Sequence, residues 1–538
     1  MLLVIIAALL AVGALASLFV APRRRLARIL ASASPLLGLL VLALPLPLPA
    51  EVSLMWLPVS LAPEPLRFVL DDGGRALGFA LLVLLTALQG SGLDRPAARR
   101  SARAAAYLMS IAAIASFAAA NPGALLLSWA WVDLLGFILI LMLRQSLPVD
   151  VGEGPTPIEI RPVAALALNS LGTLLVLVGF LPALSLQSAA PGNISLASAP
   201  ALSQLALLAG ISLRLGIFPP QLTLPRFGFS EGGYDVLVRL VPAAAGLRLL
   251  GQVWSAEAAV ALGAGWMGWI IALVCLSAFL GGVRWMVRRS ARSAQATLLA
   301  GLLALAGLAV LYGAPLEPVT RAAGLMLLLG GGLMLQYRGQ SRWQKWSIVW
   351  PLAGAAIIAG LPYTPGAALG GSLYEALIAS HAWGVLLAAG LLHIMLVGNL
   401  VRLAFESGKE LPAGEKLVWL AYYAALTLCL AALVAWPVFD FLGGPWRPGP
   451  IGSIAFAVIA AGGLALAGAA RRLRQPGEQA LATLENLTRF DWLPRGLSSI
   501  TYSVAGAVQR IDSIVSGESA LMWSLAIAVL IWVLLRGG

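Results

Sequence analysis

The chain has 538 residues, of which 60% are hydrophobic and only 11% are charged, and its mean hydropathy is +0.92. Ordinary soluble domains carry about 25% charged residues, so this composition excludes a soluble globular protein and a disordered one. The apolar residues run in continuous blocks instead of alternating as in an outer-membrane barrel. Each block has the length that a helix needs to cross roughly 30 Å of hydrocarbon. We therefore expect an all-α integral membrane protein with many spans.

The formal net charge of +12 comes from basic residues that lie between the apolar blocks, such as Arg23 to Arg25 and Arg288 to Arg289. The preference of basic loops for the cytoplasm explains this pattern, so no nucleic-acid partner is expected. Cys275 and Cys429 each lie inside an apolar block. Their placement favours two small core residues over a disulfide framework or a metal site.

Apolar blocks of spanning length predict about sixteen transmembrane helices. The block 373–402 is long enough for a half-helix followed by a full span. In chain order, the candidate spans lie near 2–20, 30–49, 76–93, 103–120, 122–144, 163–186, 198–217, 234–254, 257–282, 295–313, 320–336, 345–361, 373–402, 415–440, 451–470 and 519–535.

Basic residues alternate between the two ends of the predicted spans. Loops after odd-numbered spans are basic, whereas a loop after an even-numbered span, such as 187–200, is nearly free of Lys and Arg. The positive-inside rule places the basic loops in the cytoplasm and both chain termini outside, in a multi-pass protein of the inner (plasma) membrane. The basic loops carry Arg23 to Arg28, Arg99 and Arg100, Arg284 to Arg292, and Arg471 to Arg474.

Prolines interrupt two apolar stretches, at Pro219 and Pro220 and again at Pro362 and Pro365. Non-helical backbone at membrane depth is tolerated only where it is buried in protein or lines a cavity. Broken helices in corresponding positions of two repeats point to an ion pathway. We therefore predict two inverted five-helix repeats, although each proline pair could instead end a helix at the surface.

The predicted organisation has six parts. The segment 471–517 is polar with apolar residues at helical spacing, which favours a lateral amphipathic helix along the membrane, although a cytoplasmic loop with a short helix explains the pattern nearly as well. The parts are three N-terminal spans (1–100), a first five-helix repeat (101–255), a second five-helix repeat (256–405), two further spans (406–470), the amphipathic segment (471–517) and a final span (518–538).

Ionisable residues inside predicted spans are costly and are candidates for ion translocation. We assign this role to Asp133, Arg214, Arg239, Glu375 and His393. Asp133 and Arg214 are expected to lie within about 6 Å of each other, where opposite charges support one another. The alternatives are a static ion pair for the charged residues and a hydrogen-bonded packing role for His393. No catalytic residue or metal ligand set is predicted.

The charged motifs, in their order along the chain, resemble those of antiporter-like membrane subunits of complex I and of Mrp-type cation/proton antiporters. Leu70 to Gly73 resembles the Val-Asp-Gly-Leu motif, and Trp131 to Gly136 resembles Trp-Glu-Leu-x-Gly with Asp133 at the glutamate. Arg214 lies at the position of the lysine in the family's first broken-helix motif, and the stretch 360–375 resembles the family's second broken-helix motif. The amphipathic tail resembles the lateral helix of the most distal complex I subunit.

The departures from the family pattern concern titratable groups. The alignment puts Thr320 at the central histidine, Gly324 at the central lysine, and Leu373 or Tyr374 at the lysine of the second break. Arg239 lies close to a further histidine position. Lysine can pass a proton because burial readily lowers its pKa, whereas arginine stays protonated. These replacements predict a weakened or absent proton path, although water near Thr320 and Gly324 could bridge a gap.

The resemblance implies a membrane-arm subunit of an NADH:quinone oxidoreductase of the complex I type, which couples electron transfer to translocation of protons or cations. Such a subunit holds no redox centre, and flavin, iron–sulfur clusters and quinone are expected in partner subunits. Its partners would be other membrane subunits and the lipid bilayer. The alternatives are a component of an Mrp-type cation/proton antiporter or related ion-coupled uptake complex, and a structural subunit that has lost conduction.

Overall fold

A computed structural model of the protein describes most of the chain. The described residues are 1–19, 25–44, 51–54, 65–90, 99–144, 160–185, 200–216, 234–254, 264–287, 291–314, 316–336, 345–405, 416–435 and 449–472. The predicted amphipathic segment 471–517, the final span and the prolines Pro219 and Pro220 fall wholly or almost wholly outside these ranges.

The described residues of the first half of the chain form eight helices and one small hairpin. Helices satisfy every backbone hydrogen bond within one segment, which is why apolar blocks of this length adopt them. The elements are α1 (Leu2–Phe19), α2 (Arg25–Ala43), β1 (Glu51–Leu54), β2 (Leu66–Val69), α3 (Asp72–Gly90), α4 (Arg99–Ala118), α5 (Pro122–Arg144), α6 (Ile160–Ser185), α7 (Ala201–Leu215) and α8 (Asp235–Val253).

The described part of the second half is also helical, with a π-helical turn at Met326–Gly330 and a 3₁₀ turn at Lys345–Ile348. The α-helices are α10 (Ala264–Val287), α11 (Ala291–Leu311), α12 (Leu316–Leu325), α13 (Gly331–Gln336), α14 (Val349–Ala359), α15 (Pro365–Ala379), α16 (Trp383–Phe405), α17 (Lys416–Val434) and α18 (Pro450–Arg472).

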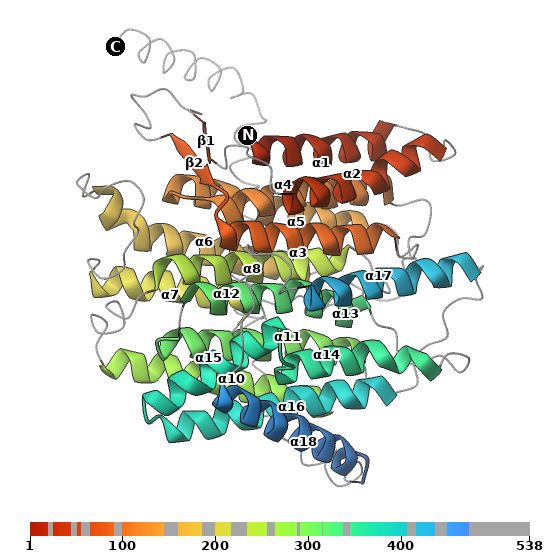
Figure 1. Ribbon diagram of the computed structural model, residues 1–538. Helices are drawn as coiled ribbons and strands as arrows, with labels where there is room; N and C mark the ends of the chain where they lie inside the picture. The colour runs from red at the N-terminus through yellow and green to blue at the C-terminus, as the bar shows by residue number, and fades with distance from the viewer. Residues whose placement is uncertain are drawn as a thin grey trace.

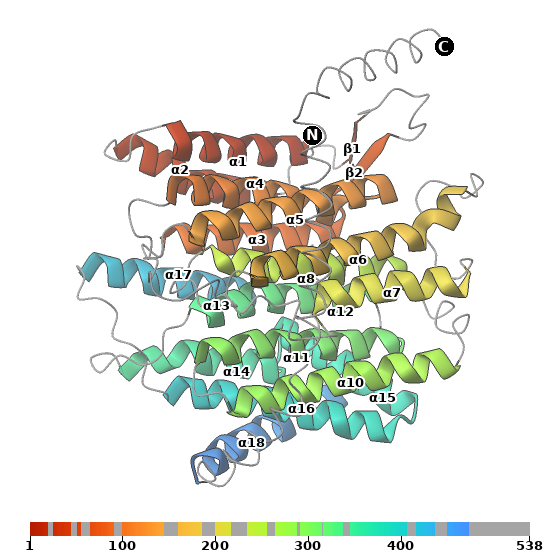
Figure 2. The same cartoon turned by 180° about the vertical axis from the view of Figure 1, so that it is seen from behind.

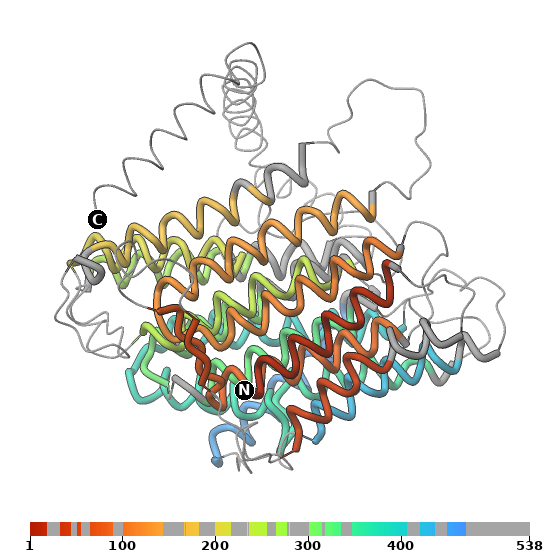
Figure 3. Tube along the Cα trace, turned by 90° about the horizontal axis from the view of Figure 1, so that it is seen from above, coloured from red at the N-terminus to blue at the C-terminus, as the bar shows by residue number. Residues whose placement is uncertain are grey.

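The long helices lie nearly parallel to one another, in a stack that runs broadly from the N-terminal helices at one end to α18 at the other (Figures 1 and 3). Helices α1 and α2 occupy one end of the stack and α18 the opposite end, as the view from behind also shows (Figure 2). Helix α17 departs from this order, because it returns to the middle and packs against α3 and the π-helical turn. The middle of the bundle is therefore built from α3, α8, α12 and α17.

Large apolar side chains remain exposed on the outside of the bundle, as lipid contact requires. Trp269, Leu387 and Leu420 are 70%, 67% and 72% exposed. Among the described helices, α3, α4, α5, α8, α16 and α18 each contain a stretch long and apolar enough to cross a membrane. A helical, multi-pass membrane architecture is thus confirmed, while the total of sixteen spans and the lateral helix stay predictions.

The long block 373–402 does not form one continuous span. Helix α15 ends at Ala379 and α16 begins at Trp383, with His381 between them at a φ of 53°. A left-handed backbone conformation is costly for a non-glycine residue and cannot continue a helix. The prediction that this block contains a half-helix followed by a full span is therefore confirmed.

The antiparallel hairpin of β1 and β2 is fastened to the turn between α4 and α5. Phe68 bridges to Ala119, and the Asn121 side chain accepts a hydrogen bond from the Arg67 backbone N–H and donates one to the carbonyl of Pro65, at 3.3 and 2.8 Å. Asn121 also accepts from the Ala124 N–H at 3.1 Å, which caps α5. One amide side chain therefore fixes the hairpin to the start of α5.

Arg248 of α8 connects α8 to α3 and α4 close to this hairpin. Its guanidinium forms an ion pair with Asp71, and its Nε donates to the carbonyl of Phe117 in α4 at 3.2 Å. Asp71 in turn accepts the N–H of Gly74 at 2.8 Å and caps α3. Arg248 is 8% exposed, so its hydrogen bond to the Phe117 carbonyl is shielded from water, whereas the Asp71 side chain is 48% exposed.

Replacing Arg248 by methionine should lower the free energy of unfolding by about 1–3 kcal/mol, because it leaves the buried Phe117 carbonyl without the Arg248 donor and removes the ion-pair partner of Asp71. The measurement is detergent-induced unfolding of the purified protein followed by circular dichroism. The matched control is Arg67→Met, which breaks the exposed pair of Arg67 and Glu51 and should cause no measurable change. Equal effects of the two variants would contradict the anchoring role of Arg248.

Candidate ion-translocation site

Asp133 and Arg214 form a buried ion pair in the first half of the chain. Asp133 lies midway along α5, and Arg214 lies at the end of α7, next to the break at Gly216. The Arg214 Nη2 and Asp133 Oδ2 atoms are 2.6 Å apart, and the two side chains are 0% and 5% exposed. The predicted pairing of these residues is confirmed.

Two uncharged residues hold the arginine in this position. Thr173 of α6 accepts a hydrogen bond from Arg214 Nη2 at 2.6 Å and donates one to Asp133 at 3.1 Å. Trp129, one turn before Asp133 on α5, lies under the guanidinium with its ring centroid 4.0 Å from Cζ. A cation over an indole face is attracted by the ring quadrupole, so Trp129 adds to the stabilisation of the charged arginine.

Glycines bring α6 and α7 close enough for these contacts. A Cβ built on Gly210 would lie 2.6 Å from the Gly172 carbonyl oxygen, closer than any real Cβ approaches. Small residues at such crossings let helix backbones approach one another in membranes. A Cβ built on Gly172 would lie 3.4 Å from the Arg214 Cγ. The close crossing therefore places Thr173, the next residue, opposite Arg214.

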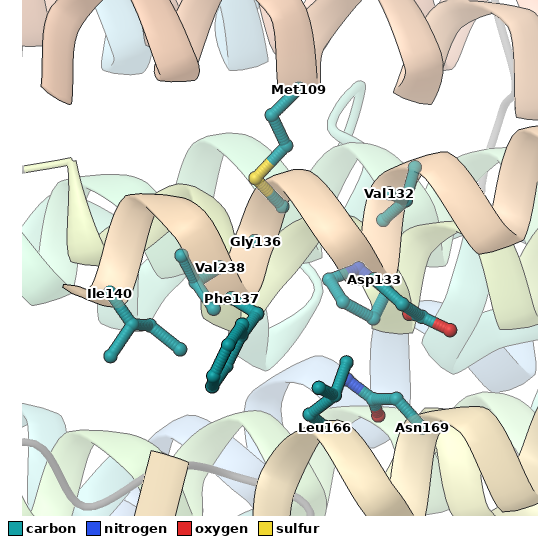
Figure 4. A pocket seen from close by; sticks show the side chains of 10 residues that line it. Met109, Val132, Asp133, Gly136, Phe137, Ile140, Leu166, Asn169 and Val238 are labelled. Carbon is teal, nitrogen blue, oxygen red and sulfur yellow. The ribbon is translucent and has the colours of Figure 1, made fainter. Parts of the chain in front are cut away.

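A narrow pocket lies beside Asp133 between α4, α5, α6 and α8. It is large enough for on the order of one water molecule and is lined mainly by apolar side chains such as Met109, Phe137 and Val238. Figure 4 shows Asp133 and the amide of Asn169 on the same side of it. Among the described residues, Asp133 Oδ1 has no hydrogen-bond partner. This oxygen is the place where a water molecule could contact the carboxylate.

The middle of the bundle is closed by apolar contacts. Gly324 of α12 faces Leu77 of α3 so closely that a Cβ on the glycine would collide with the leucine methyl group. Gly332 meets Leu84 in the same way, with 2.5 Å between the ideal Cβ and the leucine Cδ1. The π-helical turn Met326–Gly330 between these glycines is fully buried. Leu77 thus fills the place where the family alignment expects a lysine side chain.

Two polar residues lie next to this apolar centre. Thr320 is 7% exposed, and its Oγ1 atom is 2.7 Å from the position of a Cβ on Gly251 of α8. Arg321 is 8% exposed and was not among the predicted site residues. A charged residue inside the span 320–336 was a signal for it in the sequence.

The second break lies between α14 and α15, and Pro362 and Pro365 have the predicted places in it. Helix α14 ends before Gly360, which has a φ of 100°, and Pro365 occupies the first position of α15. Proline suits the first turn of a helix because that N–H has no intrahelical partner. Gly216 ends α7 in the same left-handed conformation, with a φ of 67°.

The other three candidate residues, His393, Glu375 and Arg239, lie on three different helices, α16, α15 and α8. His393 is 2% exposed and contacts the second break, whereas Glu375 is half-buried and points to Gly449 at the start of α18. Arg239 is buried on α8. Of the five candidate ionisable residues, Asp133 and Arg214 are brought together in one ion pair. The described residues contain no group of three His, Cys, Asp or Glu side chains that could hold a metal ion.

No family model and no curated protein sequence matches the chain. Solved structures do match it. A chain of the Mrp complex from Dietzia sp. DQ12-45-1b is 16% identical with a TM-score of 0.72 over 99% of this protein, which spans 62% of that chain. A chain of respiratory complex I from Thermus thermophilus is 18% identical with a TM-score of 0.63, over 87% of this protein and 100% of its own length.

A third match is a chain of the membrane-bound sulfane sulfur reductase, an archaeal respiratory membrane complex, with 16% identity and a TM-score of 0.64 over 99% of this protein and 100% of that chain. All three structures are membrane complexes of several subunits. The fold of the protein is therefore that of the antiporter-like membrane subunits, as the sequence motifs predicted.

Proposed function

We propose that the protein is an antiporter-like membrane-arm subunit of a complex-I-type quinone oxidoreductase, or of a close relative, and that its own proton path is interrupted. The observation that carries this proposal is the Asp133–Arg214 pair, whose cation cannot give up its proton. In this reading the subunit belongs to the energy-converting membrane arm but transmits or supports the coupling of its neighbours instead of conducting protons itself.

A proton relay needs groups that can be charged and neutral at accessible cost. Arg214 remains charged, so a proton bound by Asp133 would leave a buried guanidinium without its counter-ion. Thr173 and Trp129 favour the charged arginine further. These contacts support a permanent ion pair in place of a switching one.

The centre of the bundle supports the same proposal. A side chain at position 324 would have to displace Leu77, and the buried residues of the adjoining π-helical turn are Met and Leu with one glycine. Water enters a site only where it finds room and several polar partners. A water molecule that bridges the gap in the proton path near Thr320 would therefore have little space beside Gly324.

An Mrp-type cation/proton antiporter component is the second candidate. The match to the Mrp chain supports it, because that match has a TM-score of 0.72 and covers 99% of this protein. Purification of the tagged protein from its native membrane separates the two candidates. A complex-I-type subunit should co-purify with subunits that carry flavin and iron–sulfur clusters, whereas an Mrp-type component should not.

The proton path is tested by the Asp133→Asn variant in the intact complex. We expect an unchanged number of protons pumped per electron pair, because Asp133 does not switch its charge in our proposal. The double variant Asp133→Asn/Arg214→Gln removes both charges and guards against failed assembly, and Asp72→Asn on the exposed start of α3 serves as a control. Loss of a whole pumped proton in a variant that assembles and transfers electrons would refute the proposal.

A further inference from the structure

His393 of α16 contacts both half-helices of the second break. Its Nε2 atom is 2.6 Å from the carbonyl oxygen of Ile358 in α14, and its Nδ1 atom is 3.0 Å from the hydroxyl of Tyr374 in α15. The two rings are nearly parallel, with 14° between their planes. His393 and Tyr374 are 2% and 6% exposed, so these hydrogen bonds form away from lipid and water.

The end of α14 explains why a donor is needed there. The N–H groups of Gly360 and Leu361 turn back to the carbonyls of Ile357 and Ala356, at 3.0 Å each. This is the hydrogen-bond pattern of a helix that ends with a left-handed glycine. It leaves the next carbonyl, that of Ile358, outside the pattern, and a buried unpaired carbonyl is costly. His393 supplies the missing donor from a different helix.

The half-helices approach each other closely at this point. A Cβ on Gly366, in the first turn of α15, would collide with the Ile357 carbonyl oxygen, and one on Gly370 would lie 3.7 Å from the His393 Cε1. Thr364 closes the turn between the half-helices by donating to the Leu361 carbonyl at 2.6 Å. The imidazole ring therefore spans the break on the side where both half-helices contact α16.

The hydrogen-bond partners determine the tautomer of the ring. A carbonyl oxygen only accepts, so Nε2 carries the hydrogen that is donated to Ile358. In the neutral ring Nδ1 is then the acceptor for the Tyr374 hydroxyl. A proton cannot pass through Nε2, because the peptide carbonyl beyond it is the end of the chain of hydrogen bonds.

We infer that His393 is a neutral latch, a positioning residue that fastens the half-helices α14 and α15 to α16 with its hydrogen on Nε2. Tyr374, one of the two residues that align with the family's lysine, contributes its hydroxyl to the latch. A neutral hydroxyl and a neutral ring therefore replace a charged side chain at this break. Glu375, the next residue, points instead to Gly449 before α18. The latch depends only on the geometry of the second break and holds whether or not the subunit conducts protons.

The tautomer can be observed directly because the chain has only two histidines. His381→Asn removes the other one at little cost, since His381 has a φ of 53° and asparagine tolerates that conformation. In ¹⁵N-histidine NMR of this variant, full length in nanodiscs, we expect a protonated Nε2 and an unprotonated Nδ1. Tyr374→Phe should shift the Nδ1 signal and leave Nε2 protonated. A ring protonated on Nδ1, or on both nitrogens, would overturn the inference.

Hydrogen exchange measures whether the latch holds the break. His393→Leu should raise amide exchange in residues 356–368 about tenfold, because the break opens more easily without the hydrogen bond to Ile358. His393→Gln keeps a donor at a similar reach and should restore most of the protection. The control Leu392→Ala removes buried apolar contact from the same helix without a polar group. Unchanged exchange in His393→Leu, or an equal increase in Leu392→Ala, would reject the latch.

Discussion

Removing Arg214 alone is expected to lower the free energy of unfolding by about 3–5 kcal/mol, as is removing Asp133 alone, because either change leaves an uncompensated charge in a buried site. The variants are Arg214→Met and Asp133→Leu. The double variant should be close to wild type, since apolar side chains of similar size often replace a buried ion pair without loss. The measurement is detergent-induced unfolding followed by circular dichroism, analysed as a double-mutant cycle.

Smaller changes around the pair should follow the contacts of Arg214. Thr173→Val removes one hydrogen-bond partner and should cost about 1 kcal/mol. Ser128→Ala is the matched control on α5, because Ser128 is buried and its hydroxyl donates to the Ala124 carbonyl of its own helix. Its loss should be nearly neutral.

The outcome of this cycle also bears on function. Single variants that cost less than about 1 kcal/mol would mean that water already compensates the charges. A hydrated pair is what a conducting half-channel needs, so that result would favour proton translocation through this half of the subunit. A strong coupling between the two positions is instead the signature of a dry, static pair.

Most of the helices could be predicted from the sequence because a membrane leaves few alternatives for a long apolar block. The pairing of Asp133 with Arg214 followed from the same physics, since two isolated charges in different spans are each too costly alone. Position in the chain was a poor guide in one case: α17, late in the sequence, returns to the side of α3.

The uncharged parts of the site could not be predicted. Thr173, Trp129 and Tyr374 are residue types that occur throughout apolar helices, so the sequence does not reveal the contacts that they make with Arg214 and His393. Their roles depend on which helix faces which, and that is decided by close glycine crossings such as Gly172 with Gly210. The Ile358 carbonyl, a backbone group, has no sequence signal apart from the following Gly360.

Adding a methyl group at the centre of the bundle should be destabilising. Gly324→Ala is expected to cost about 1–3 kcal/mol, because its Cβ collides with Leu77 and a packed core has no room to yield. The control Gly330→Ala adds the same methyl group to the adjoining π-helical turn, where no described atom outside the local helix lies within 4 Å of the new Cβ, and should be tolerated. Thermal unfolding of the purified protein, read from tryptophan fluorescence, compares the two.

A second change at Leu77 tests whether this contact is what closes the centre. Leu77→Ala should cost about 2–5 kcal/mol by leaving a cavity. The double variant Gly324→Ala/Leu77→Ala should cost less than the sum of the single variants, because the new methyl group partly fills that cavity. Simple additivity, with no penalty for Gly324→Ala, would mean that Leu77 moves aside freely. Space for water would then exist at the position of the family's central lysine, and the interruption that we propose for the proton path would lose its structural basis.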